Sequence, residues 1–174
     1  EQIAGLVIHP AERQKEAGEI LSHAGVASGV VFDGSRLHDP EVVKRLQALS
    51  PDIGVSVSFG YILKPEILEL CPRGWVNLHP PLLPYNRGAF PNVWSIIEGT
   101  PAGVTLHYMD SGVDTGDIVA QVEVRVEPTD TGETLYRKLE QAGIELFMDT
   151  WPSIRAGHAP RRSQSAGSGT IHRA

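Results

Sequence analysis

The sequence predicts an α/β protein with an open, mostly parallel, Rossmann-like sheet that carries helices on both faces. Short apolar runs alternate with segments of helical periodicity along most of the 174 residues, which is the pattern of such a sheet. The length, with 41% hydrophobic and 21% charged residues, matches one globular domain. Ligands of open α/β sheets lie beyond the carboxyl ends of the strands, so residues at those ends are the first candidates for a site.

The first half of the chain contains three apolar runs that predict strands. The first run ends at His9-Pro10, and the third alternates bulky residues with glycine and serine, which predicts one bulky and one small face. Asp39 followed by Pro40 has the pattern of a helix N-terminus. The expected strands are 3–8, 30–32 and 53–59, and the expected helices are 11–24, 40–49 and 65–70.

The second half repeats the α/β pattern. A strand over 75–79 should stop at Pro80-Pro81, because proline cannot donate to a sheet. Asp130 with Glu133 has the form of a capping box, which should begin a long helix that Pro152 breaks or bends. The remaining expected elements are a helix over 91–98 and strands over 104–109 and 118–126 on either side of a loop over 110–117.

The pattern of elements predicts one folded domain over residues 1–154 and a polar tail or linker over 155–174. The formal charge is 15 − 21 = −6, which argues against nucleic acid as the main partner. Cys71 is the single cysteine, so an internal disulfide or a cysteine metal cage is excluded. We expect a cytoplasmic protein without a membrane span and without a metal site.

Asn77 and His79 are the first candidates for chemistry. They are two residues apart in the expected strand, so their side chains should share one face. An amide can donate to a developing oxyanion, and an imidazole can move a proton near neutral pH. A carboxylate beside His79 would hold its tautomer, and Asp110, Asp114 and Asp117 all remain candidates from spacing alone.

Two further residues have plainer interpretations. His107 lies within an expected strand, and a core histidine whose ring is hydrogen-bonded is the favoured interpretation. Cys71 should be buried and unreactive.

Two motifs occur in order and at a characteristic distance. The first runs from Asn77 to Pro84 (NLHPPLLP) and is followed by Arg87-Gly88, and the second runs from Val104 to Ile118 (VTLHYMDSGVDTGDI). Together they resemble the signature of the folate-dependent formyltransferases. The resemblance covers roughly residues 50 to 125. It implies that residues 1–154 are a formyltransferase catalytic domain.

The resemblance implies a reaction and a set of site residues. A substrate amine would attack the formyl carbon of N10-formyltetrahydrofolate, the formyl donor, with Asn77, His79 and Asp114 as the catalytic residues and no metal. Asn77 and protonated His79 would stabilise the tetrahedral oxyanion, and Asp114 would help to relay the proton that leaves the amine. The implied binding residues are Tyr61, Ile62, Leu63, Val113 and Asp114 for the pterin of the cofactor, and Arg87 and Gly88 for the substrate.

Residues outside the two motifs narrow the choice of acceptor amine. Trp94 has a counterpart in methionyl-tRNA formyltransferase, but that enzyme carries a further C-terminal domain for tRNA, so tRNA is disfavoured as a partner. The segment from Tyr85 to Trp94 (YNRGAFPNVW) does not resemble the glycinamide ribonucleotide enzymes. It is similar to enzymes that formylate nucleotide-linked amino sugars or amines of peptide natural products, which implies a small-molecule amine as substrate.

The start of the chain departs from the family pattern. Members of the family begin with a strand and a helix that this chain is expected to lack, since residues 3–8 correspond to their second strand. A partner chain or domain could then complete the sheet. Three alternatives therefore stay open: a truncated, non-catalytic relative, a formyltetrahydrofolate hydrolase, and an enzyme with methionyl-tRNA formyltransferase-like activity.

Overall fold

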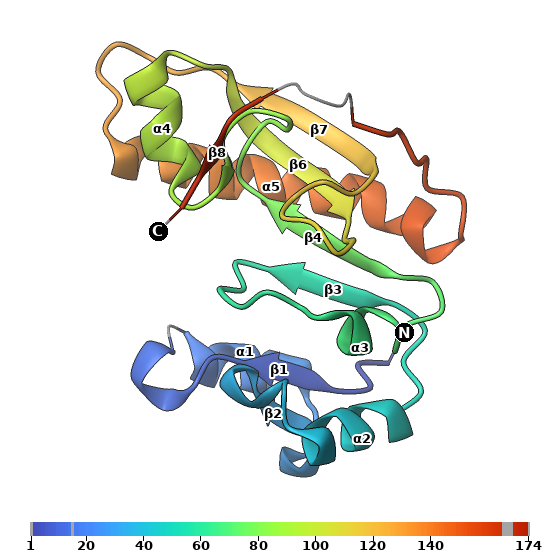
Figure 1. Ribbon diagram of the computed structural model, residues 1–174. Coiled ribbons are helices and arrows are strands. Elements are labelled where there is room, and N and C mark those ends of the chain that lie inside the picture. The colour runs from blue at the N-terminus through green and yellow to red at the C-terminus, as the bar shows by residue number, and fades with distance from the viewer. Residues whose placement is uncertain (1, 15, 165–168, 174) are drawn as a thin grey trace. The chain divides into compact units, whose positions relative to one another are not determined.

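A computed structural model describes residues 2–14, 16–164 and 169–173, and it divides the chain into two compact units (Figure 1). The first unit consists of the residues up to Gly54 together with 58–75, and the second of 55–57 together with the residues from Val76 onward. Each unit is described by itself.

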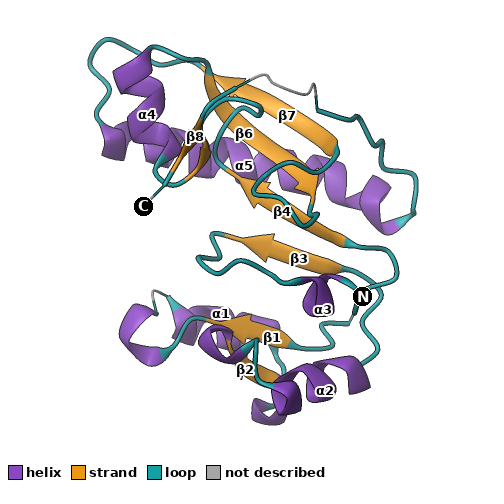
Figure 2. Ribbon diagram, in the orientation of Figure 1, coloured by secondary structure: helices purple, strands orange, loops and turns teal. Residues whose placement is uncertain are grey.

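The first unit is built on two short parallel strands. Strand β1 (Leu6–Ile8) pairs with β2 (Val31–Asp33), with Val7 opposite Phe32. Among its described residues, this unit also contains three α-helices and three 3₁₀ turns (Figure 2, purple). Their bounds are α1 (Ala17–Ala24), α2 (Pro40–Ala48), α3 (Pro65–Leu68), η1 (Ala11–Arg13), η2 (Ser28–Val30) and η3 (Gly34–Arg36).

Helix α2 begins where the sequence predicts. The Asp39 carboxylate accepts a hydrogen bond from the Glu41 backbone N–H at 3.0 Å, and Pro40 occupies the first turn. The helix predicted over residues 11–24 is divided, since η1 covers only its start and α1 begins at Ala17. The reason is the backbone at Glu16, whose φ of 55° is left-handed and cannot continue a helix.

The second unit contains a four-stranded sheet in the order β3, β4, β6, β7. The strands are β3 (Gly54–Val57), β4 (Trp75–His79), β6 (Ala102–Tyr108) and β7 (Ile118–Val124). The β4–β6 and β6–β7 pairs are antiparallel, and the register shifts between Leu106 and His107. Helix α4 (Pro91–Glu98) ends at Gly99, where φ is 62°.

Helix α5 (Gly132–Arg155) lies along β6 and β7 and forms the core of this unit (Figure 1). Leu135 and Leu139 of the helix pack against Ala102 and Val104 of β6, and all four are buried. Gly143 of the helix also faces the sheet, where a Cβ would make ordinary van der Waals contact with Leu78 and Val104, both at 3.5 Å. Burial of this apolar stripe supplies the main stabilisation of the unit.

The predicted start of the long helix differs from the structure, and the predicted break at Pro152 does not occur. Thr131 and Thr134 form the capping box, and Asp130 instead accepts hydrogen bonds from the Glu127 backbone and the Thr134 hydroxyl. The helix also continues through Pro152 to Arg155. Pro152 lies in the last turn, so its missing N–H removes one bond close to the helix end, where little helix remains to be lost.

Residues after α5 pair with strands of the same unit. Arg162 forms a bridge with Ile118 at the start of β7, and β8 (Ile171–His172) pairs in parallel with β5 (Arg87–Gly88). The predicted fold class, an open α/β Rossmann-like sheet with helices on both sides, is confirmed. Within the described residues, no helix is long and apolar enough to cross a membrane.

Candidate active site

The carboxyl end of β4 carries Asn77 and His79, as predicted. The β4–β6 register places His107 directly opposite Asn77 and Thr105 directly opposite His79. Side chains of directly opposed residues lie close together on one face of an antiparallel pair. The Asn77 amide nitrogen accordingly lies 3.3 Å from His107 Nε2.

Thr105 fixes the chain immediately after His79. Its buried hydroxyl donates to the Pro81 carbonyl at 2.8 Å and accepts from the Leu83 backbone N–H at 3.0 Å. Gln121 also donates to this hydroxyl, at 3.0 Å. The turn that begins at the two prolines is therefore held to the sheet by side chains of β6 and β7.

Of the three candidate aspartates, the structure brings Asp114 to His79. Asp114 Oδ2 lies 3.0 Å from His79 Nε2 and accepts the Gly88 backbone N–H at 2.8 Å. Asp110 instead binds its own loop, through the Gly112 N–H at 3.0 Å and the Thr115 hydroxyl at 2.6 Å. Asp117 accepts the Ser163 hydroxyl at 3.0 Å.

Asp114 is a buried carboxylate on strained backbone. Its side chain is 12% exposed, and its φ of 54° is left-handed. Burial by itself would raise the pKa of Asp114, but the hydrogen bond and charge of His79 and the hydrogen bond from Gly88 outweigh burial and hold the pKa below 3.8. The carboxylate is therefore ionised at neutral pH and faces the imidazole of His79.

His107 forms the inner wall of this cluster. Its ring is 2% exposed, and Nδ1 lies 2.8 Å from the Tyr108 carbonyl, which can only accept. Nδ1 therefore carries the hydrogen, and Nε2 accepts from the Asn77 amide. Burial lowers the pKa of His107, although the Tyr108 carbonyl and Asp114, whose Oδ1 is 3.8 Å away, oppose that shift. Neutral His107 thus fixes the Asn77 amide through one of its two N–H groups.

The cluster combines three chemical capacities at one strand end. Asn77 provides an amide N–H that His107 does not use, His79 provides an imidazole that can hold or move a proton, and Asp114 provides a fixed negative charge beside it. A neutral hydrogen-bond donor together with an imidazole and carboxylate pair suits the stabilisation of an oxyanion and transfer of a proton. The roles assigned to these residues remain predictions.

The residues predicted to bind substrate lie next to Asp114. Gly88 is bonded to the Asp114 carboxylate, and Arg87 Nη2 donates to Gln164 Oε1 at 2.8 Å. The Gln164 amide nitrogen in turn donates to the Asp114 and Gly116 carbonyls, both at 2.8 Å. The guanidinium of Arg87 is therefore held in place by a residue far along the chain.

The residues predicted to bind the pterin fall in both units, and each segment is described separately. In the first unit Tyr61 packs against Phe59 and His9, with the Arg13 guanidinium 5.4 Å from the centre of its ring. Ile62 is 79% exposed, whereas Leu63 is buried. In the second unit Val113 is exposed at the tip of the loop that carries Asp114. Each of these two segments thus presents one exposed apolar side chain.

Other reactive residues take no part in the cluster. Burial raises the pKa of Cys71 to about 11, so its thiol stays protonated at neutral pH and is not a nucleophile. Among residues 2–14, 16–164 and 169–173, no group of three or more His, Cys, Asp or Glu side chains could hold a metal ion.

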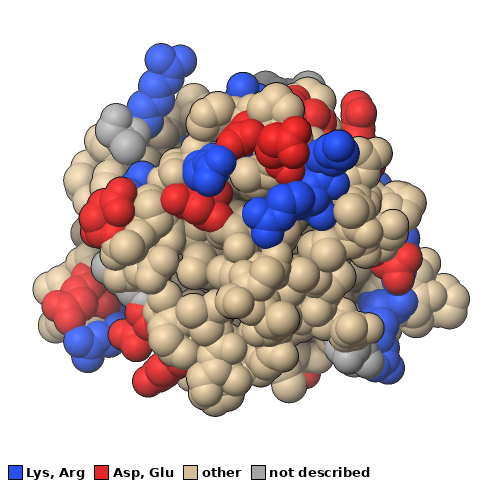
Figure 3. Space-filling model, turned by 90° about the horizontal axis from the view of Figure 1, so that it is seen from below, with Lys and Arg blue, Asp and Glu red and all other residues tan. Residues whose placement is uncertain are grey.

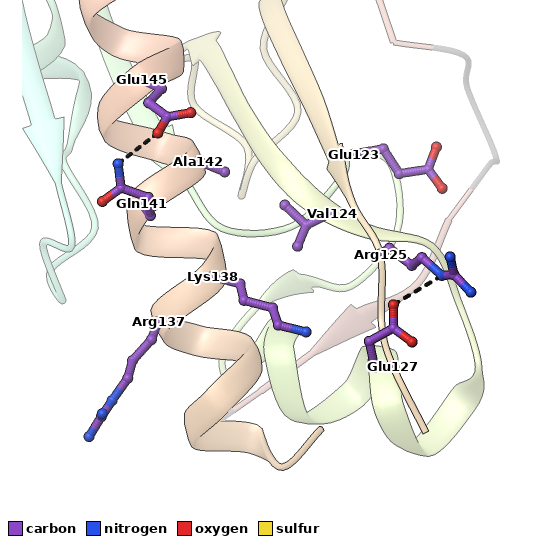
Figure 4. A pocket seen from close by; sticks show the side chains of 9 residues that line it. All are labelled: Glu123, Val124, Arg125, Glu127, Arg137, Lys138, Gln141, Ala142 and Glu145. Carbon is purple, nitrogen blue, oxygen red and sulfur yellow. Dashed lines mark hydrogen bonds and ion pairs between the residues drawn. The ribbon is translucent and has the colours of Figure 1, made fainter. Parts of the chain in front are cut away.

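A shallow groove of about 660 Å³ lies away from this cluster, between β7 and α5 (Figure 4). Several of its polar side chains pair with one another: Gln141 donates a hydrogen bond to Glu145, and Arg125 forms an ion pair with Glu127. The lining residues are Glu123, Val124, Arg125, Glu127, Arg137, Lys138, Gln141, Ala142 and Glu145. Charges of both signs are also mixed on the face shown in Figure 3, so neither feature favours one class of charged ligand.

Two residues have contacts in the site that the sequence does not predict. His107 is the buried, hydrogen-bonded histidine that the sequence favours, but its place opposite Asn77 depends on strand register, which the period-2 pattern of one strand does not reveal. Gln164 lies in a segment interpreted as a polar tail, and no motif marks it. A search for polar residues in both strands of each expected pair would have found His107 but not Gln164.

Comparison with known proteins identifies the family. A family model described as formyl transferase matches residues 3–150. Methionyl-tRNA formyltransferases from Symbiobacterium thermophilum and Clostridioides difficile are 38% and 37% identical over 170 and 171 residues. Each match covers 94% of this chain but only 52% and 55% of the relative, so the chain spans about half the length of these curated relatives.

Solved structures agree with this relationship. The formyltransferase PseJ from Anoxybacillus kamchatkensis, in complex with UDP-4,6-dideoxy-4-formamido-L-AltNAc and tetrahydrofolate, is 34% identical, with a TM-score of 0.71 over 97% of this chain and 84% of that one. A sugar N-formyltransferase from Shewanella is 26% identical, with a TM-score of 0.78 over 94% of this chain and 61% of that one. The sequence match and the fold agree: this chain belongs to the formyl transferase family.

Proposed function

We propose that this protein transfers a formyl group from N10-formyltetrahydrofolate to a primary amine, most favourably on a nucleotide-linked amino sugar or on an intermediate of a peptide natural product. The observation that carries the proposal is the convergence of Asn77, His79 and Asp114 at the end of β4, with Asp114 Oδ2 3.0 Å from His79 Nε2. Family membership supplies the class of reaction, and this cluster supplies groups suited to it.

The proposed chemistry assigns each residue one task. As the amine nitrogen bonds to the formyl carbon, the carbonyl oxygen becomes an oxyanion that the Asn77 amide and protonated His79 stabilise. The bond from the formyl carbon to N10 of the folate then breaks, and the proton lost by the amine moves to the departing nitrogen. Asp114, ionised at neutral pH, stabilises the imidazolium of His79 and assists that proton transfer, directly or through water.

The formyl donor is proposed to contact Tyr61, Ile62 and Leu63, and the backbone of Val113 and Asp114. Backbone groups of the loop suit the hydrogen-bond donors and acceptors at the edge of the pterin, and the exposed apolar side chains of Ile62 and Val113 suit the flat faces of a ring. N10-formyltetrahydrofolate supplies the activated one-carbon unit.

The acceptor is proposed from the environment of Arg87. Its guanidinium, fixed by Gln164, suits a phosphate or carboxylate of the substrate, and the neighbouring Gly88 is proposed to line the same part of the site beside Asp114. PseJ, with its UDP-linked sugar, supports a nucleotide-linked amine. Methionyl-tRNA is the second candidate acceptor, favoured by the 38% identity to a methionyl-tRNA formyltransferase.

A donor-binding measurement comes before any assay of activity. The chain is first shown to be folded by circular dichroism and is then titrated calorimetrically with 5-formyltetrahydrofolate, a stable analogue. Saturable binding to one site supports the proposal. A folded chain that does not bind this analogue contradicts it and favours a non-catalytic relative.

A panel of acceptors then tests the reaction. Release of tetrahydrofolate is followed with a UDP-linked 4-amino sugar, a dTDP-linked 3-amino sugar, glycinamide ribonucleotide and initiator methionyl-tRNA. Transfer to an amino sugar at least about tenfold faster than to the others supports the proposed acceptor. Preference for methionyl-tRNA selects the second candidate, and formate release without any acceptor indicates a hydrolase instead.

A further inference from the structure

The segment 161–164 is fastened to the start of β7 and to the loop that carries Asp114. Arg162 and Ile118 exchange two backbone hydrogen bonds, of 2.8 and 3.0 Å. The Ser163 hydroxyl donates to Asp117 at 3.0 Å, and the Arg161 guanidinium lies 3.5 Å from the centre of the Tyr108 ring. These contacts bring Gln164 to the loop from a distance of 50 residues along the chain.

Gln164 uses both ends of its amide. The amide nitrogen donates to the Asp114 and Gly116 carbonyls, both at 2.8 Å, so both of its hydrogens have acceptors. The amide oxygen accepts from Arg87 Nη2, also at 2.8 Å. One partly buried side chain therefore joins the loop of Asp114 to the arginine proposed to hold the substrate.

The Asp114 loop needs support of this kind. The left-handed backbone of Asp114 is unfavourable for a residue with a Cβ and persists only where the surroundings hold it. Gly116 packs so tightly that a Cβ there would stand 1.9 Å from the Tyr108 carbonyl. Gln164 secures the carbonyls of both residues, and the side chain of Asp114 is then free to face His79 and the Gly88 N–H.

Two separate connections consequently join β5 to Asp114. The Gly88 N–H reaches the carboxylate directly, and Arg87 reaches the Asp114 backbone through Gln164. A shift of the Arg87 side chain on substrate binding would therefore change the position of Asp114, which faces His79.

We propose that Gln164 is a positioning residue that fixes the Asp114 carboxylate opposite His79 and couples its position to Arg87. The inference rests on the proposed function for its effect on catalysis, but the placement of Asp114 can be tested without any activity. Gln164 contacts no reacting atom, so its influence acts through Asp114 and Arg87.

Amide hydrogen exchange in the full chain measures the placement. The Gly88 N–H is bonded to Asp114, whereas the neighbouring Arg87 and Ala89 N–H groups are bonded to Thr170 and His172 of the opposite segment, both at 3.0 Å. In Gln164→Ala and Gln164→Glu, exchange at Gly88 should be at least about tenfold faster, with Arg87 and Ala89 unchanged. Gln164→Glu is informative because it keeps an acceptor for Arg87 but turns a carboxylate toward two carbonyls.

The same hydrogen-exchange measurement on a control variant shows whether the effect is specific to Gln164. Gln141→Ala, an exposed glutamine of α5 bonded to Glu145, should leave all three amides unchanged. Unchanged exchange at Gly88 in both Gln164 variants overturns the inference. Equal acceleration at all three amides also overturns it, because Gln164 would then only anchor the tail.

Kinetics test the coupling once an acceptor has been identified. Gln164→Ala should lower kcat about tenfold or more with little change in the KM for the formyl donor. The losses from Arg87→Ala and Gln164→Ala should not multiply in the double variant, because both act through one connection. Losses that multiply overturn the coupling. A chain that formylates no acceptor defeats the proposed function, whereas the exchange result decides the placement independently.

Discussion

The cluster around Asp114 and the groove between β7 and α5 both contain opposite charges, but they are built differently. In the groove Arg137 pairs with Glu133 one helical turn away, and both side chains are more than 70% exposed. In the cluster, His79, His107 and Asp114 come from two strands and a loop, and none of the three is more than 18% exposed. Gly88 and Gln164, from two further segments, hold Asp114 in place.

Polar contacts are expected to affect stability more in the cluster than in the groove, because the contacts of the cluster are buried. An exposed pair within one helix is screened by water and contributes roughly 0 to 1 kcal/mol. A buried polar group that loses its partner costs about 1 to 3 kcal/mol, and more if it is charged. The contacts of the cluster should therefore control both stability and chemistry, and those of the groove should control neither.

The largest effect is expected from His79→Ala. Because the imidazole is proposed to stabilise the oxyanion and move the proton, the formyl-transfer rate should fall by roughly 10²- to 10⁴-fold. The affinity for 5-formyltetrahydrofolate, measured by calorimetry, should change little. The matched control is His158→Ala, an exposed histidine of the same unit. Equal losses of rate and affinity would remove His79 from the chemistry.

The second largest effect is expected from Asp114→Asn, which should lower the transfer rate by about 10²-fold or more at pH 7. It should also change the pH dependence of stability. Because the pKa of Asp114 is held below 3.8, its carboxylate stabilises the fold above that pH, and this contribution is lost as the pH falls through the lowered pKa.

Urea unfolding at pH 7, 5 and 3 measures this contribution. The difference in unfolding free energy between the wild-type chain and Asp114→Asn should be largest at pH 7 and 5 and should shrink at pH 3. The control is Asp149→Asn, an exposed aspartate of α5. A difference that stays constant over this range would show that the charge of Asp114 does not stabilise the fold.

His107→Leu should have a smaller effect on rate, about tenfold, because it removes the acceptor that orients Asn77 without touching the reacting groups. Burial lowers the pKa of His107 in the folded chain. Just below pH 6.5, His107 therefore binds a proton in the unfolded chain but stays neutral in the folded chain. This component makes the wild type lose stability as the pH falls, by up to about 1.4 kcal/mol per pH unit.

Urea unfolding at pH 7.5 and 5.5 should show this component in the wild type and in His158→Leu, but not in His107→Leu. If all three chains lose the same stability between these two pH values, His107 is not held neutral by the fold.

The smallest effect is expected from Arg137→Ala in the groove. Its pair with Glu133 is exposed, so the unfolding free energy should change by less than about 0.5 kcal/mol and the transfer rate should not change. Thermal unfolding and the acceptor assay measure both. A loss comparable with that of His107→Leu would place the groove among the functional surfaces and would remove the contrast between the two regions.

The sequence predicted most of the elements that position the site. Strand β4 and helix α4 have the predicted bounds, because the signals that end them are local: prolines after His79 and a left-handed glycine after Glu98. The division of the helix at Glu16 was not predicted, because its left-handed backbone is not encoded by a glycine. Of the two effects predicted at Pro152, a break or a bend, the break does not occur, because the cost of a proline depends on its distance from the helix end.

Local periodicity predicts the fold class, whereas the family and the candidates Asn77, His79 and Asp114 come from the resemblance of two contiguous motifs to the formyltransferases. The folded chain adds contacts that spacing leaves open: Asp114, of three candidate aspartates, is the one that reaches His79. Neutral His107 fixes Asn77, and Gln164 holds the Asp114 loop to Arg87. The physical reason is that strand register and the return of a distant segment are set by packing and by satisfaction of buried polar groups, and no local pattern records either.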